Sequence, residues 1–147
     1  ISSDMITGFC TETEEEHQDT LTLMDIVKYD FSYMFYYSER PGTLAAKKYE
    51  DDIPLEIKKR RLAEIISKQA ELSFQRNQLD LHQEQLILIE GTAKKSDQQL
   101  KGRNSANKVV IIPASQAKKG DYVKVKITEV SQATLFGEVL EVNPILA

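Results

Sequence analysis

The sequence predicts an α/β unit, a long helix and a small all-β barrel, in that order along the chain. Apolar runs at residues 2–9 and 31–37 flank a helical pattern, and this order is typical of a βαβ crossover with parallel strands. Turn residues then divide residues 82–142 into short strands with one apolar face, which favours closure into an antiparallel barrel. We therefore expect one domain over residues 1–79 and an all-β domain over residues 80–143.

The first helix is predicted to begin after Thr13. Thr13 and Glu16 have the spacing of a capping box, in which each side chain bonds the backbone N–H of the other residue. His17, Leu21 and Met24 then fall on one face, as a half-buried helix requires. No catalytic partner stands at a recognised spacing from His17, so we interpret this histidine as a packed side chain.

A second, longer helix is predicted from Pro54 to about Asn77, after a loop at residues 38–52. Proline is well tolerated in a first helical turn. The apolar stripe of this helix consists of Leu55, Leu62, Ile65, Ile66 and Leu72. The four consecutive cations at 58–61 wrap around the helix, and we favour a solvated face over an RNA contact for them.

Five strands are predicted in the second domain, over residues 82–91, 99–104, 107–113, 121–130 and 133–142. The fourth shows the clearest pattern, because Tyr122, Lys124 and Lys126 alternate with apolar residues. Closure of the barrel should bury the apolar side of this strand. The tyrosine and the two lysines should then lie together on the outer face.

Composition and charge limit the possible functions. With 41% hydrophobic and 29% charged residues, the chain has a globular rather than a disordered composition. Residues 1–53 hold 12 acidic and 4 basic residues, whereas residues 54–147 hold 11 acidic and 15 basic ones. This split favours an anionic partner for the second part, although a solvated surface explains it equally well.

Cys10 is the single cysteine of the chain. No internal disulfide can form, which fits a cytoplasmic protein. One thiol cannot hold an iron–sulfur cluster or a structural zinc ion. The sequence also shows no metal-ligand cluster and no nucleophile triad, so we expect no metal site and no catalytic residue in this chain itself. No apolar run is long enough to cross a bilayer, and no membrane partner is expected.

Candidate binding residues fall into two groups. In parallel α/β folds, ligands bind beyond the carboxyl ends of the strands. Gly8, Phe9 and Arg40 follow the carboxyl ends of the two predicted strands and are therefore candidates. Glycine lets a ligand approach the backbone, and arginine pairs with anions, but ordinary turn chemistry explains these residues as well. The second group lies on the barrel and combines cations with one aromatic residue: Lys94, Lys95, Arg103, Lys108, Tyr122, Lys124 and Lys126. Small barrels use such surfaces to bind phosphates and stack bases, so this group indicates RNA binding, while solubility alone also explains the lysines.

Several motifs, in order, resemble the radical S-adenosylmethionine methylthiotransferases. They are Asp4–Thr13, Tyr37–Thr43 with Ala45-Ala46 after it, Ile53–Arg60, and the barrel, which resembles the TRAM domain of that family. Cys10 stands where the family is expected to have proline. The resemblance implies the C-terminal βαβ part of a partial (β/α) radical SAM barrel, a linker helix and a five-stranded, antiparallel, OB-like TRAM barrel.

Within the family, the segments Arg40–Thr43 and Gly102–Lys108 look most like the branch that acts on tRNA. The resemblance implies an enzyme that adds a methylthio group to isopentenyl-adenosine next to the anticodon, with S-adenosylmethionine and two 4Fe–4S clusters as cofactors. It also implies that Gly8 and Phe9 form a wall of the S-adenosylmethionine site. Because no set of cluster cysteines is present, we expect a C-terminal piece that is inactive alone and that contributes tRNA binding.

The expected partners follow from the same resemblance. They are the anticodon stem-loop of tRNA and the missing N-terminal part of the same protein. Strands that lack their neighbours expose apolar faces, so the isolated chain is expected to self-associate. Alternative interpretations are a non-catalytic RNA-binding module of another protein, or a sister methylthiotransferase that acts on a ribosomal protein or on threonylcarbamoyl-adenosine.

Overall fold

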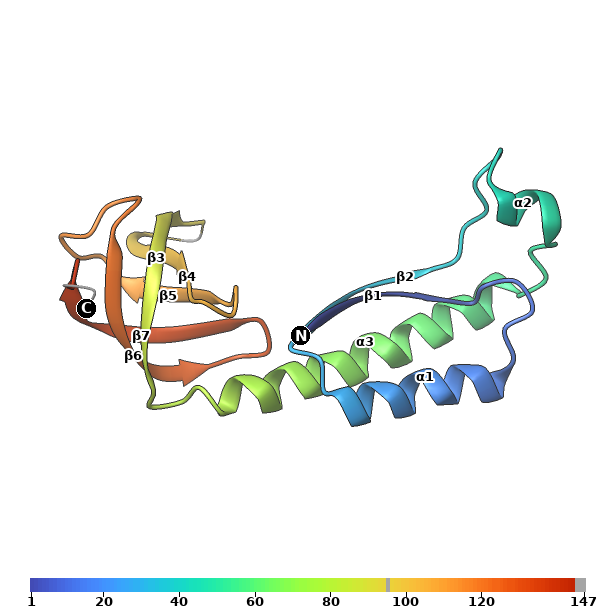
Figure 1. Ribbon diagram of the computed structural model, residues 1–147, viewed down its shortest axis with the longest axis horizontal. Helices are drawn as coiled ribbons and strands as arrows, with labels where there is room; N and C mark the ends of the chain where they lie inside the picture. The colour runs from blue at the N-terminus through green and yellow to red at the C-terminus, as the bar shows by residue number, and fades with distance from the viewer. Residues whose placement is uncertain (95, 145–147) are drawn as a thin grey trace. The chain divides into compact units, whose positions relative to one another are not determined.

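The chain is described by a computed structural model that covers residues 1–94 and 96–144 (Figure 1). It divides into two units, Ile1–Ser73 and Phe74–Ala147, each with its own apolar core. In the described part of the chain, no helix is both long enough and apolar enough to span a membrane.

The first unit is a βαβ crossover, as the sequence predicts. Strand β1 (Ser2–Thr7) pairs in parallel with β2 (Phe31–Tyr36), and helix α1 (Glu14–Val27) connects them. Helix α1 and the long helix α3 (Leu55–Gln78) both lie on one face of this sheet, as Figure 1 shows. The core between sheet and helices contains Met5, Met24, Ile65 and Leu72.

Local signals account for the helix boundaries in this unit. The capping box is present at α1, because the Glu16 N–H donates to Thr13 Oγ1 at 3.2 Å and the Thr13 N–H donates to Glu16 Oε2 at 2.8 Å. The helix ends at Lys28, which adopts a left-handed conformation with φ of 53°. A short helix, α2 (Leu44–Lys48), lies inside the predicted loop, and Thr43 caps it by accepting a hydrogen bond from the Ala46 N–H.

The second unit contains a closed barrel with the strand order β3-β4-β5-β7-β6. Its strands are β3 (Glu84–Ala93), β4 (Ser96–Arg103), β5 (Val109–Pro113), β6 (Tyr122–Val130) and β7 (Thr134–Val142). The expectation of a fully antiparallel barrel is wrong, because β5 and β7 pair in parallel. Five strands cannot alternate in direction all the way around a closed ring, so one neighbouring pair must run the same way.

The barrel interior is filled by alternate residues of these strands. The fully buried side chains include Ile87, Val110, Val123, Val125 and Leu135. Gly102 on β4 lies very close to β3, since a Cβ atom at this position would stand 2.7 Å from the Leu88 carbonyl oxygen. A glycine is therefore required where these two strands approach each other.

Candidate nucleic-acid interface

Leu88 is the centre of a row of three side chains on the outer face of the barrel. It pairs with Arg103 of β4 on one side and with Tyr122 of β6 on the other. Residues directly opposite each other in paired strands point to the same face of the sheet. Ile87 and Ile89 are buried inside, so Leu88 must face outward, where it is 39% exposed. The row thus presents a guanidinium, an aliphatic and an aromatic side chain to solvent.

This row lies in a groove of about 780 Å³. The groove brings together Arg103 and Tyr122, two residues that the sequence predicts for RNA binding. Further residues of the lining were missed in the sequence: Leu86, Leu88, Asn104, Asn107 and the carboxylates Asp80, Glu84 and Glu90. A signal for the leucines exists, because residues 86–89 are all apolar and only alternate ones can face the core.

Arg103 is held in place by neighbours within the groove. Its Nε donates to Glu90 Oε1 at 3.1 Å, and its Nη1 donates to the backbone oxygen and Oδ1 of Asn107 at 2.9 and 3.2 Å. The guanidinium therefore has a fixed orientation while its side chain is 36% exposed.

Two of the predicted lysines also pair with carboxylates of the barrel unit. Lys108 Nζ lies 2.6 Å from Asp80 Oδ2, and the two side chains are only 12% and 17% exposed. Lys124 Nζ lies 2.7 Å from Glu84 Oε2 on the exposed surface. The Lys124–Glu84 hydrogen bond raises the pKa of Lys124 and lowers the pKa of Glu84. These cations are therefore less available to phosphate than the sequence alone suggests.

The remaining predicted lysines lie elsewhere on the barrel. Lys126 is exposed on β6 and stands opposite Glu84 on β3 and Glu138 on β7. Lys94 is exposed in the turn between β3 and β4. Lys95, predicted together with it, lies outside the described residues.

The predicted residues of the first unit do not form one site. Gly8 adopts a φ of 69°, its N–H donates to Glu12 Oε1 at 2.9 Å, and a Cβ atom there would meet the Lys58 side chain at 2.6 Å. The Phe9 ring packs edge-on against Tyr37 and Tyr49, with centroids 5.0 and 5.9 Å away. Both residues are thus engaged in packing within the unit.

Arg40 lines a different groove, of about 720 Å³, beside the uncovered face of the β1–β2 sheet. Its other lining residues include Asp4, Ile6, Tyr33, Phe35 and Tyr36, and neither Gly8 nor Phe9 is among them. The groove therefore combines one guanidinium with aromatic side chains. This pairing of residue types was not visible in the sequence, because it depends on which face of each strand packs against the helices.

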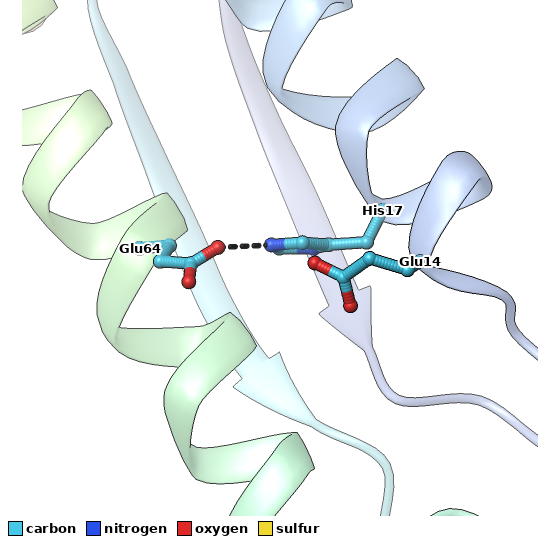
Figure 2. A group of neighbouring side chains, drawn as sticks. All are labelled: Glu14, His17 and Glu64. Carbon is cyan, nitrogen blue, oxygen red and sulfur yellow. Dashed lines mark hydrogen bonds and ion pairs between the residues drawn. The ribbon is translucent and has the colours of Figure 1, made fainter.

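A cluster of titratable side chains joins α1 to α3 (Figure 2). His17 is fully buried, and its Nε2 lies 2.6 Å from Glu64 Oε2. Arg60 donates to both Glu14 and Glu64, at 2.6 and 2.7 Å. Oxygen and nitrogen atoms of Glu14, His17 and Glu64 lie within 4.8 Å of one another, a spacing that metal ligands also have. However, arginine side chains already form ion pairs with both carboxylates. The cluster is best explained as a connection between the two helices.

Acid is expected to destabilise this unit between pH 4.5 and pH 2. Hydrogen bonding by Arg60 lowers the pKa of Glu14 from 4.5 to about 2, and hydrogen bonds from His17 and Arg60 lower the pKa of Glu64. The folded state then binds fewer protons than the unfolded state, so this stabilisation is complete above pH 4.5 and is lost as the pH falls towards 2. Thermal melts followed by circular dichroism from pH 7 to pH 2 measure the loss.

Glutamine variants test whether Glu14 and Glu64, rather than other acidic groups, cause this loss of stability in acid. Glu14→Gln combined with Glu64→Gln should flatten the fall in melting temperature, whereas Glu15→Gln, exposed on the same helix, should leave it unchanged. An unchanged fall in the double variant would show that other groups carry the acid sensitivity.

Comparison with known proteins places these observations in a family. The family model of the TRAM domain matches residues 80–140. The tRNA-2-methylthio-N(6)-dimethylallyladenosine synthase of Amoebophilus asiaticus is 63% identical over 139 residues, which is 95% of this chain and 29% of that protein. The synthases of Christiangramia forsetii and Flavobacterium psychrophilum are 54% and 50% identical, each over 94% of this chain and 29% of the relative.

The chain thus spans about 29% of the length of these relatives. A solution structure of a conserved protein from Methanococcus maripaludis matches 42% of the chain at 28% identity, with a TM-score of 0.35 that is too low to define a shared fold. The chain carries a TRAM domain and, along nearly all of its length, is a relative of the tRNA-2-methylthio-N(6)-dimethylallyladenosine synthases, which confirms the family resemblance of its motifs.

Proposed function

We propose that this chain is part of a tRNA-modifying methylthiotransferase and that its barrel contributes tRNA binding. The observation that carries the proposal is the 63% identity to a synthase of that name over 95% of the chain. The outer groove of the barrel supports it, because Arg103 and Tyr122 supply a cation and an aromatic surface within one groove, on either side of Leu88. The proposed substrate is the dimethylallyl-bearing adenosine that the relatives' name describes, next to the anticodon.

In this proposal, residues 1–79 belong to a radical SAM barrel with its linker helix, and residues 80–143 form an OB-like TRAM barrel. Helices cover one face of the β1–β2 sheet, while Ile6, Tyr33 and Phe35 on the other side are 57–62% exposed. We assign the cover of this face to the part of the relatives that this chain does not span. The isolated chain should then self-associate through it.

The cofactors of the whole enzyme would be S-adenosylmethionine and two 4Fe–4S clusters, which together supply radical chemistry. The chain itself does not fit a cluster, because Cys10 is its single cysteine and is 3% exposed. Gly8 has its N–H bound to Glu12 and its α-carbon covered by Lys58. In this proposal, Gly8 and Phe9 therefore support a wall of the cofactor site through their packing and do not bind the cofactor directly. No catalytic step is assigned to this chain.

Binding of an anticodon stem-loop RNA is expected to weaken as salt rises. Each phosphate contact changes the slope of log K against log salt by about −0.7 to −0.9, so about two to four contacts give a slope of roughly −1.5 to −3.5. The contacts are assigned to the exposed cations of the barrel, such as Lys94 and Lys126. Fluorescence anisotropy titrations at several salt concentrations measure the slope.

Single lysine variants test the assignment. Lys126→Ala should make the slope of log K against log salt less steep by about 0.7–0.9, the contribution of one phosphate contact. Lys118→Ala, in an exposed loop outside the proposed surface, should leave the slope unchanged. Salt-independent binding by the unmodified chain would refute the proposed role of the barrel in holding RNA.

A further inference from the structure

The groove that holds Arg103 and Tyr122 is poorly suited to a phosphate. Its described lining contains three carboxylates, Asp80, Glu84 and Glu90, against the single guanidinium of Arg103. The neighbouring cations are each bound to one of these carboxylates: Lys108 to Asp80, Lys124 to Glu84 and Lys101 to Glu90. Arg103 is the one cation of the described lining, and its guanidinium is already bound to Glu90 and Asn107, so the groove offers a phosphate little available positive charge.

The surface between these charges is suited to a flat, uncharged ring. Leu86 and Leu88 line the groove, and Tyr122 is 43% exposed in it. Arg103 presents a guanidinium whose orientation is fixed by Glu90 and Asn107. Aromatic rings and arginine planes are the surfaces on which unstacked bases of single-stranded RNA lie.

The strand register sets the spacing between Arg103 and Tyr122 across the groove. Arg103 and Tyr122 stand opposite the same residue, Leu88, on the strands at either side of β3. Two strand spacings of about 4.8 Å separate their backbones by about 10 Å. A separation of this size is compatible with one flat ring between the two side chains, which line the same groove.

We infer that the groove takes one unstacked nucleobase of the bound RNA, between the Arg103 guanidinium and the Tyr122 ring and above Leu88. The phosphates of the same RNA then lie on lysines outside the groove. This inference rests on the proposed function, because it specifies which part of the RNA the groove receives.

The test uses the full chain and anticodon stem-loop RNAs in which one loop nucleotide at a time lacks its base. For the unmodified chain, removal of one particular base should weaken binding by about 5- to 150-fold, the effect of losing one stacked base. Tyr122→Ala should weaken binding of the intact RNA by a similar factor and should no longer respond to removal of that base. The slope of log K against log salt should stay the same in Tyr122→Ala, because no phosphate contact is lost.

Further variants separate stacking from charge and from folding. Tyr122→Phe should keep both the affinity and the response to base removal, whereas Tyr122→Leu, which retains an apolar side chain on β6, should behave like Tyr122→Ala. Lys126→Ala should make the slope of log K against log salt less steep. Binding by this variant should still respond to base removal.

The outcomes distinguish this inference from the proposed function. The nucleobase groove would be overturned if Tyr122→Ala and Tyr122→Leu still responded to base removal. It would also be overturned if the slope of log K against log salt became less steep in them, as in Lys126→Ala. Either result would leave RNA binding by the barrel intact. Failure of the unmodified chain to bind the RNA at any salt concentration would overturn both.

Discussion

Replacement of Arg61 by alanine is expected to destabilise the protein by about 3–5 kcal/mol. The Arg61 side chain is only 5% exposed, and its Nη1 donates to the carboxylate and the backbone oxygen of Glu12 at 2.7 and 3.0 Å. Glu12 is itself 14% exposed. Truncation of the arginine leaves this carboxylate poorly solvated and without its charge partner, which costs more than the net value of the pair.

Arg60 provides the matched control for this experiment. It is the preceding residue on α3 and bonds Glu14, as Arg61 does, but its side chain is 44% exposed. Arg60→Ala should therefore cost less than about 1 kcal/mol. Urea unfolding followed by circular dichroism measures both values, and equally small losses would mean that water replaces the guanidinium beside Glu12.

Leu135→Ala is expected to destabilise the barrel by about 2–5 kcal/mol. Leu135 is fully buried in the barrel core, on strand β7. It pairs with Val110 of β5 and Val130 of β6, so its side chain fills the interior where the barrel closes. Removal of the isobutyl group loses its transfer free energy and leaves a cavity that rigid strands cannot fill.

Leu140 provides the control, because it is also on β7 but its exposed side chain can be truncated without leaving a cavity. Its side chain is 47% exposed, so Leu140→Ala should change the free energy of unfolding by only about 0.5 kcal/mol. Urea titrations of the two variants give the comparison. A loss at Leu140 equal to that at Leu135 would indicate that β7 is stabilised by strand propensity rather than by core packing.

The positions of most elements were predictable because their signals are local. The capping box of Thr13 and Glu16 marks the start of α1, and both of its hydrogen bonds are present. The alternation around Val123 and Val125 marks β6, whose apolar side faces the core. Such patterns depend on residues a few positions apart, which the sequence displays directly.

Features that depend on partners distant in sequence were not predictable in the same way. A closed ring of five strands requires one parallel pair, and the strand order makes it β5 and β7; no residue in either strand shows this. Lys58 and Arg61 stand in a run of cations that suggests a solvated face, yet both residues are buried. Their burial depends on Asp51 and Glu12, which lie on other segments.

The candidate RNA surface shows the same division. Charge and alternation identify Arg103 and Tyr122 as outward-facing residues of the barrel. Leu88 connects them only through the register of β3 with both neighbours, and an irregularity between Ile89 and Gly91 shifts that register on the β4 side. The pairing of Lys124 with Glu84 likewise depends on register and could not be derived from composition.

The place of β7 in the barrel has a consequence for synthesis of the protein on the ribosome. This strand lies between β5 and β6, yet it is the last of the barrel strands to be made. Until it emerges, the nascent barrel has two open strand edges beside an uncovered set of valine and isoleucine side chains. Open edges and exposed apolar faces promote pairing between chains, so the nascent protein is most prone to aggregation in the interval before β7 leaves the ribosome.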